Sequence, residues 1–388
     1  MRRVRTSSSS HFRMKGYSVK LRAGDWVEVR SKAEILKSLD RQGRLDRLPF
    51  MPHMFQYCGQ QFQVYKRAHK TCDTVNQTGG RRLADAVHLD LRCDGETYGG
   101  CQAHCLIFWK GAWLKRVERE GRTDEGPQLD ERVTPDRLSP TVGCTEEDVL
   151  AATQAEAQHP DGERRFVCQA TELPHYTNLL PWWDVRQYME DYHSGNVTHG
   201  ALFRGFVFAG YQKLIKSGIG LGGPLRWLYD HFQALWGGIP YPCRGGRISA
   251  GQSTPNRVLN LQPGEVVRVK SYQEILSTLD VESKNRGLYF DTELVPYCGG
   301  IYRVKTRVSK YINEKTGMMV NLKTDAVILE GVWCQARYSN CRMFCPRSIY
   351  SWWREIWLER IPGGNHDADV PRLRSAFHKP GRSQRRNG

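Results

Sequence analysis

The chain of 388 residues lacks any uninterrupted apolar stretch long enough to cross a bilayer, and its first twenty residues lack the apolar core of a secretory signal. We therefore expect a soluble protein that stays in the cytoplasm, although the Arg- and Ser-rich, acid-free start also matches an organelle transit peptide. Thiols stay reduced in the cytoplasm, where clustered cysteines bind metals more often than they pair. The twelve cysteines are therefore expected to be mostly free or metal-bound.

Motifs that would name a reaction are also missing. The sequence has no Ser/His/Asp order, no paired-carboxylate motif, no His-Glu-x-x-His segment and no dinucleotide fingerprint. The glycine-rich segment 217–224 lacks the Lys-Ser/Thr pair of a phosphate-binding loop. Whether the protein is an enzyme stays open, and the sequence favours a non-enzymatic role.

Acidic residues are scarce, with 41 Asp and Glu against 57 Lys and Arg, which gives a net charge of +16. Such an excess attracts polyanions, including nucleic acid and anionic lipid. Part of this charge falls in the two ends of the chain, residues 1–16 and 363–388, which we expect to be disordered basic arms.

The sequence contains an internal repeat. Residues 24–31 (GDWVEVRS) match residues 264–271 (GEVVRVKS), and Tyr57-Cys58-Gly59 matches Tyr297-Cys298-Gly299. Three further cysteines keep the register in each copy, so that the matched sets are Cys58, Cys93, Cys101 and Cys105 in the first copy and Cys298, Cys334, Cys341 and Cys345 in the second. Each copy closes on an aromatic and basic segment.

Local patterns predict the elements of each copy. The opening run alternates apolar and polar residues as a half-buried strand does, and Ser31 with Glu34, like Ser271 with Glu274, forms a capping box for a short helix. Later alternating runs predict further strands around residues 62–66, 87–89, 302–305 and 327–329. The expected fold class is α+β, with two small β-rich modules joined by a helical region.

The expected boundaries are module 1 at 17–118, a polar linker with one helix capped by Thr145 at 119–170, an aromatic and helical connection at 171–250, and module 2 at 255–362.

The opening strand of each copy resembles SH3-like barrels, including the KOW modules of translation and transcription factors. The whole chain is similar to uncharacterised bacterial proteins with paired Cys-rich modules, which carry the same Tyr-Cys-Gly and Cys-Pro-Arg-Ser-Ile-Tyr segments. The first resemblance implies barrel-type modules, and the second implies no function.

Four thiolates complete the tetrahedral shell of Zn²⁺, and such a site adds folding energy to a small module. The spacings are C-x34-C-x7-C-x3-C and C-x35-C-x6-C-x3-C, without the C-x2-C knuckle of zinc ribbons. We expect one Zn²⁺ in each copy. A [4Fe–4S] cluster, disulfides and plain buried thiols remain alternatives.

The first copy alone contains Cys72 and the nearby His69, which are candidates for an extra ligand or a reactive thiol. Cys144, Cys168 and Cys243 receive no role.

A nucleic acid or another polyanion is the predicted partner. Its contacts are expected at basic and aromatic residues of both copies, namely Lys66, Arg67, Trp109, Lys110, Arg303, Lys305, Arg347 and Arg354.

The middle of the chain is aromatic. We expect Trp182 and Trp183 to pack against a module, and residues 199–238 to form two helices. Basic residues beside Trp227 and Trp236 in those helices suit a membrane surface, while a helical hairpin that connects the modules explains the same residues without a ligand.

The sequence thus supports a metal-binding tandem-module protein that binds a polyanion. The alternatives are an iron–sulfur enzyme or electron-transfer protein with a pocket in the central region, and a structural scaffold for protein interactions.

Overall fold

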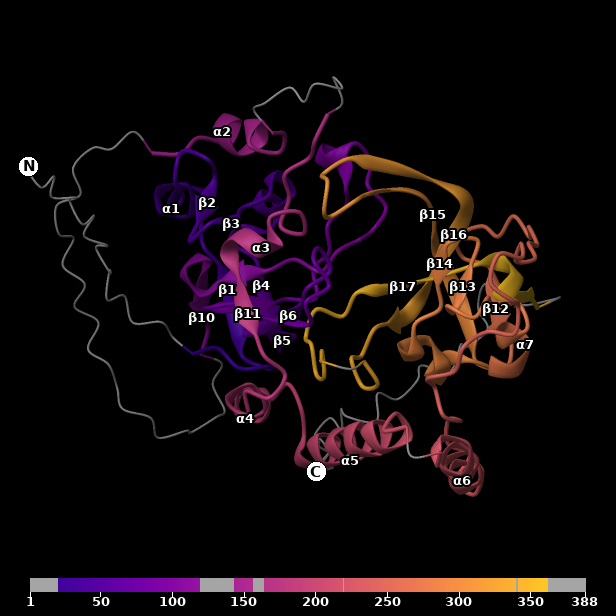
Figure 1. Cartoon of the computed structure of the whole chain (residues 1–388). Helices are drawn as coiled ribbons and strands as arrows, with labels where there is room; N and C mark the ends of the chain where they lie inside the picture. Colours follow the sequence, from indigo (N-terminus) through magenta and orange to yellow (C-terminus); the bar gives the residue numbers. More distant parts are fainter. Residues whose placement is uncertain (1–19, 119–142, 156–163, 219, 340, 362–388) are drawn as a thin grey trace, which may run out of the picture.

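A computed structural model of the chain describes residues 20–118, 143–155, 164–218, 220–339 and 341–361. The predicted arms at 1–16 and 363–388, and much of the predicted linker, lie outside these described residues. The fold is α+β, with several small antiparallel sheets and short helices (Figure 1).

The N-terminal half is built on strand β1 (Trp26–Val29). This strand lies between β10 (Leu114–Arg116) and β4 (Gln61–Gln63), both antiparallel to it. The other elements of this half are α1 (Lys32–Ser38), β2 (Arg44–Leu45), β3 (Leu48–Pro49), η1 (Pro52–Tyr57), β5 (Lys66–Arg67), β6 (Lys70–Cys72), β7 (Gly80–Arg82), β8 (Ala86–His88), η2 (Glu96–Tyr98), β9 (Trp109–Lys110) and η3 (Gly111–Trp113).

The C-terminal half has a similar order of elements, with the long strands β15 and β16 where the N-terminal half has the short strands β4 to β8. Its sheet runs β17-β16-β15-β12-β18. The elements are β12 (Val266–Val269), α7 (Tyr272–Leu276), β13 (Lys284–Asn285), β14 (Leu288–Tyr289), η4 (Thr292–Tyr297), β15 (Ile301–Ile312), β16 (Met319–Trp333), β17 (Tyr350–Trp353), η5 (Glu355–Trp357) and β18 (Leu358–Arg360).

Strand register agrees between the halves. Val27 pairs with Phe62 on β4, and Val267 pairs with Tyr302 on β15. The packing agrees as well, because Phe50 meets Trp113 edge-on at 5.1 Å and Phe290 meets Trp357 edge-on at 5.2 Å, both between ring centroids. Each half therefore has its own aromatic core.

The predicted capping boxes of α1 and α7 are both present. In each, the serine hydroxyl accepts from the backbone of the glutamate three residues on, and that glutamate reaches back to the serine. The predicted helix after Thr145 is α2 (Glu146–Ala151), and Thr145 caps it.

The connecting region holds α3 (Leu173–Tyr176), β11 (Asn178–Leu180), α4 (Arg186–His193), α5 (His199–Ile215) and α6 (Gly222–Ala234). The predicted pair of helices in residues 199–238 is confirmed by α5 and α6. The expectation that Trp182 and Trp183 pack against a module is wrong, because their exposed fractions are 46% and 67%.

Two hairpin arms cross between the halves. The first arm, residues 70–82, is the β6–β7 hairpin. Its Cys72 amide donates to Cys345 Sγ at 3.2 Å. The second arm, residues 306–328, is the long β15–β16 hairpin, which reaches over the N-terminal half (Figure 1).

Near the tip of the second arm, backbone amides of Ser309 and Lys310 donate to Gln102 Oε1 at 2.7 and 3.1 Å. Each half thus places an arm on the cysteine-bearing loop of the other.

Candidate metal centre

A cavity of about 530 Å³ lies between the two halves and is lined by cysteines from both. Its wall also includes Arg342, Glu314 and aromatic residues such as Tyr311 and Trp352. None of its lining residues falls within 171–250, the central region in which the sequence suggested a pocket.

Four cysteines of the N-terminal half and its connecting segment line a second, smaller cavity of about 30 Å³. We call them the first cysteine set, and they are Cys93, Cys101, Cys105 and Cys168. Burial raises the pKa values of the Cys93 and Cys105 thiols, and it raises that of Cys168 to about 11. A volume of this size holds one ion or one water molecule.

Cys168 reaches this cavity because of the second arm. Its segment pairs with the arm's tip through a bridge between Arg165 and Met318, and the Phe166 amide donates to Gly317 O at 2.8 Å. The second arm also contacts the set directly, since the Ile312 amide donates to Cys101 Sγ at 3.4 Å.

A second cysteine set borders the large cavity through Cys72, Cys334 and Cys345. Cys72 of the first arm packs with Cys334 and Cys345. The exposed Cys341 lies beside the same arm, close enough to Gly79 that a Cβ added there would be 3.4 Å from the Cys341 Cβ. A hydrogen bond from the Cys72 thiol lowers the pKa of Cys345 to about 7, despite its burial. Of the three packed thiols Cys72, Cys334 and Cys345, Cys345 is therefore the one that most readily ionises.

Cys58 and Cys298 line neither cavity. They end the 3-10 helices η1 and η4, where their amides donate to Phe55 O and Val295 O at 3.1 Å. Lys32 and Glu146 lie near the Cys58 thiol, and burial raises the pKa of Cys298 to about 12. Equivalent packing at a helix end is reason enough for both copies to have a cysteine there.

The structure thus brings together Cys93, Cys101 and Cys105 of the first predicted set, with Cys168 in place of Cys58. Of the second predicted set it brings together Cys334 and Cys345, with Cys72 in place of Cys298. Cys72 was singled out in the sequence without a partner. Cys168 carried no sequence signal, because it lies outside the repeat.

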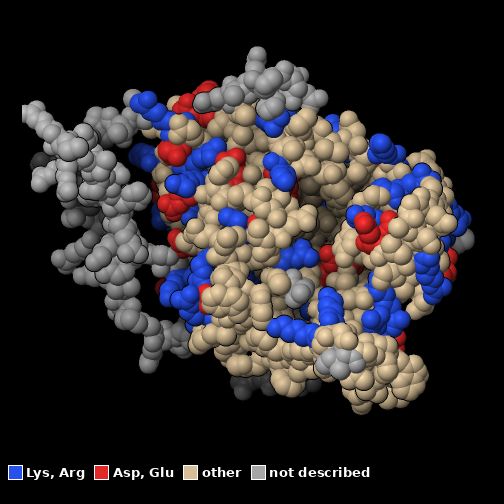
Figure 2. All heavy atoms as spheres, viewed as in Figure 1, with Lys and Arg blue, Asp and Glu red and all other residues tan. Residues whose placement is uncertain are grey.

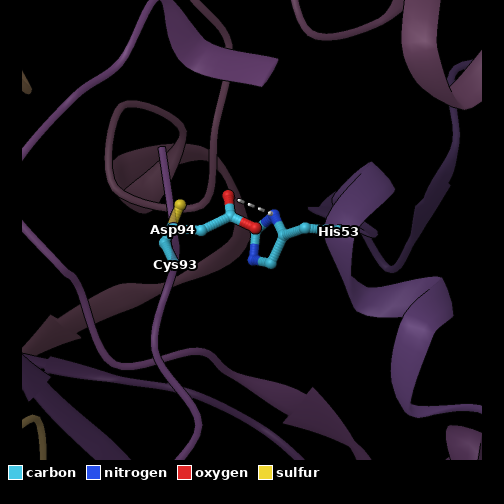
Figure 3. Close-up of side chains that lie close together, drawn as sticks. All are labelled: His53, Cys93 and Asp94. Carbon is cyan, nitrogen blue, oxygen red and sulfur yellow. Dashed lines mark ion pairs between the residues drawn. The ribbon is translucent and has the colours of Figure 1, made fainter. Parts of the chain in front are cut away.

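Figure 3 shows a different donor group, His53, Cys93 and Asp94. Among the described residues, it is the one group of three or more His, Cys, Asp or Glu residues whose ligand atoms all lie within 4.8 Å of one another. Asp94 Oδ1 lies 4.0 Å from His53 Nδ1, and both ring nitrogens of the buried His53 lack hydrogen-bond partners. Burial lowers the pKa of His53, which favours the neutral, metal-binding form.

In neither cysteine set do three sulfur atoms lie within 4.8 Å of one another, as far as the described residues go. Because a tetrahedral zinc site has Zn–S distances of about 2.3 Å, its sulfur atoms are closer together than this. Metal binding therefore requires rotation of cysteine side chains into the cavity.

His69, the other predicted ligand, belongs to a buried charged cluster beside the second set. Its Nε2 lies 3.1 Å from Asp191 Oδ1, and Lys70 Nζ lies 2.5 Å from Asp191 Oδ2. Burial lowers the pKa of Lys70, and the Asp191 charge opposes that shift. Lys70 also donates to Met343 O at 2.8 Å, so the cluster joins α4 to the first arm and to the second cysteine loop.

The predicted polyanion contacts do not form an exposed basic surface. Trp109, Lys110, Arg347 and Arg354 are buried, and Lys110 donates to Asp46 at 2.9 Å. Lys66, Arg67 and Arg303 are half-buried, and only Lys305 of the eight is exposed. Figure 2 shows Lys and Arg side chains distributed in several groups over the visible face.

Arg347 instead lies between the two cysteine sets. It is 2% exposed, lines the smaller cavity, and donates to Thr74 Oγ1 at 2.6 Å and Glu314 Oε1 at 3.0 Å. Burial raises the pKa of Cys105 and the Arg347 charge opposes that rise, while at Cys345 the same charge adds to the lowering of the pKa by the Cys72 hydrogen bond. The guanidinium is therefore a buried positive charge near thiols of both sets.

Comparison with known proteins adds no assignment to this geometry: the chain matches no protein-family model, no curated protein and no solved structure.

Proposed function

We propose that the protein binds two Zn²⁺ ions, one in each cysteine set, and that these ions fasten two homologous SH3-like modules to each other. The observation that carries the proposal is the first cysteine set, in which four thiols from three separate segments line a single cavity of about 30 Å³. Apolar packing alone gives no reason for four thiols to converge on one cavity.

The donor set favours zinc. Thiolates are soft ligands, and four of them close the coordination shell, which is typical of structural rather than catalytic zinc. A cluster of four irons and four sulfides is several times larger than one ion, so a cavity of about 30 Å³ suits the ion.

Charge supports the same assignment. A zinc ion with four thiolates has a net charge of −2, which is costly to bury without a compensating cation. Arg347 is buried between the two sets and close enough to affect the pKa values of cysteines in both. Its position therefore suits two anionic metal centres.

The fourth ligand of each set depends on the opposite half. Cys72 comes from the N-terminal half to meet Cys334 and Cys345, and Cys168 is held by pairing with the second arm. Metal binding would therefore lock the arms in place. The role that follows is structural: the ions fix the shape of the large cavity between the halves.

The test is metal analysis of the full-length protein and four single variants. We expect two zinc ions per chain in the wild type, and about one in Cys168→Ser and in Cys345→Ser, because each change removes one ligand of one set. The matched controls Cys58→Ser and Cys298→Ser should keep two.

Loss of metal from the two controls but not from Cys168→Ser would instead favour the sets predicted from the repeat. Iron with acid-labile sulfide and a brown colour would replace zinc with a cluster. If His53→Ala loses the first ion and Cys168→Ser keeps it, the donors of Figure 3 hold the metal. Cobalt substitution provides a second readout, because the intensity of its thiolate absorption follows the number of Cys ligands.

A further inference from the structure

The helices of the connecting region expose an unusual amount of apolar surface. Most of the large apolar side chains that are exposed in the described chain lie between residues 179 and 236. The three highest exposed fractions belong to Leu235 (79%), Trp236 (73%) and Phe203 (70%), and the rings of Trp183 (67%) and Trp227 (61%) are also largely exposed. Contiguous exposed apolar surface of this kind marks a site of interaction.

Helix α5 attaches to the rest of the molecule by one face only. Gly205 lies against Phe344, where an added Cβ would come within 2.4 Å of the ring, and Phe208 packs against Tyr338 with ring centroids 4.9 Å apart. Phe203, Val207 and Leu214 on the remaining surface are exposed.

Helix α6 is attached still more loosely, because none of its residues is buried. Tyr229 contacts Tyr211 and Tyr241, and Asp230 forms an ion pair with Arg244. The exposed apolar residues Leu228, Phe232, Leu235 and Trp236 follow one another at helical spacing. In Figure 1 the α5–α6 hairpin lies at the bottom of the view, outside both halves.

The hairpin is also basic. Between residues 198 and 238 the sequence contains Arg204, Lys213, Lys216 and Arg226 but a single acid, Asp230. In Figure 2 the region of the hairpin is mostly tan, with Lys and Arg above it and almost no red. Lys213 Nζ lies 3.8 Å from the centroid of the exposed Trp182 ring, so aromatic and basic groups are adjacent.

We propose that the α5–α6 hairpin, with Trp182 and Trp183, docks the protein onto an anionic membrane surface. Tryptophan, phenylalanine and leucine beside lysine and arginine are the composition of helices that lie in the headgroup region. The aromatic rings enter the boundary of the acyl chains while the cations meet lipid phosphates.

The positive charge of the hairpin favours an anionic membrane, rather than a second copy of the chain, as the surface that covers it. Two basic hairpins on molecules of net charge +16 repel each other, whereas an anionic leaflet attracts both the hairpin and the whole molecule. No described helix is long and apolar enough to cross a membrane, and the proposal concerns adsorption of the hairpin in the plane of the interface.

The experiment is co-sedimentation of the full-length protein with vesicles of phosphatidylcholine alone and of phosphatidylcholine with 30% phosphatidylglycerol. We expect binding to the anionic vesicles only, and weaker binding as salt increases. The triple variant Trp227→Ala/Phe232→Ala/Trp236→Ala should lose binding at least about 100-fold, since each change removes a large apolar side chain from the interface.

The control variant Val258→Ala/Val281→Ala/Ile301→Ala truncates three exposed apolar residues of the C-terminal region and should bind as the wild type does. Lys213→Glu/Lys216→Glu should weaken binding to anionic vesicles at least about 25-fold, because each basic residue near the surface contributes roughly five-fold.

Three outcomes would overturn the proposal. One is the absence of vesicle binding, and another is unchanged binding of the triple variant, which would point to the basic ends of the chain. The third is a dimer in light scattering that the triple variant abolishes, because the hairpin would then be an interface between two copies.

Discussion

His88 is a buried histidine whose surroundings permit only the neutral ring. Its Nδ1 lies 2.8 Å from Ile107 O and must donate to that carbonyl, while Nε2 is buried without a hydrogen-bond partner. A proton on Nε2 would leave a buried N–H unsatisfied, and burial lowers the pKa of His88 to about 3.

We predict that His88 makes the protein less stable in mild acid. Its folded pKa lies below its unfolded value near 6.5, so the unfolded chain binds a proton first as the pH falls. The neutral His88 ring makes its full contribution to the free energy of unfolding above about pH 6.5. That contribution decreases as the pH falls toward 3, so the free energy of unfolding should be lower by roughly 3 kcal/mol at pH 4. Urea denaturation at pH 7, 5.5 and 4 measures it.

The variant His88→Asn is the matched comparison, because the asparagine amide can still donate to Ile107 O without titrating. We expect a lower free energy of unfolding at pH 7 but a shallower loss between pH 6.5 and 4. Equal slopes for the two proteins would show that His88 is not the titrating group.

At the scale of single elements, α1 and α7 are short helices that begin with the same capping box. Ser31 pairs with Glu34, and Ser271 with Glu274. Helices of this length have few internal hydrogen bonds, so their formation depends on the cap and on packing of Ile35 and Ile275 in the two cores.

We predict that Ser31→Ala and Ser271→Ala each lower the free energy of unfolding by about 1 kcal/mol, since each leaves backbone amides without a partner. The double variant should lose about the sum, because the two sites share no contact. Lys37→Ala, an exposed position of α1, is the control and should change stability little. Chemical denaturation of the wild type and the four variants measures these changes. A double variant as stable as either single variant would contradict the independence of the two caps.

At the scale of the whole molecule, the N-terminal half supplies Cys72 to the second cysteine set, and the second arm holds the segment that contains Cys168. Under the proposed function the metal ions therefore contribute to the association of the halves as well as to their folding. Without the ions, what holds the halves together includes hydrogen bonds such as Arg347 to Thr74 and the Ser309 amide to Gln102.

We predict that a zinc chelator lowers the melting temperature by more than about 10 °C and resolves one calorimetric transition into two, one for each half. The double variant Cys168→Ser/Cys345→Ser should melt at the chelated temperature with or without chelator, whereas Cys58→Ser/Cys298→Ser should respond as the wild type does. An unchanged single transition in chelator would contradict the fastening role of the metal.

Local features of the fold were predictable from the sequence. The strands β1 and β12, the two capping boxes, the helix after Thr145 and the α5–α6 pair all follow from residue patterns a few positions long. Periodicity and caps act between near neighbours, and for that reason they are readable without tertiary structure.

Which side chains are buried could not be predicted from such local patterns. Arg347 and Lys110 resemble surface cations in sequence but are buried with acidic partners, while Trp182 and Trp183 resemble core residues but are exposed. A side chain's environment depends on which distant segment packs against it, and composition contains no record of that contact.

The sequence by itself determined the short elements of each half and pointed to five of the cysteines that line a cavity, namely Cys93, Cys101, Cys105, Cys334 and Cys345. Only the tertiary structure decided the remaining members of the two sets, Cys168 and Cys72 rather than Cys58 and Cys298. The physical reason is the exchange of arms, through which residues more than a hundred positions apart come into contact. An alignment of the two copies shows which positions are equivalent, but it does not show which residues of one half contact the other half.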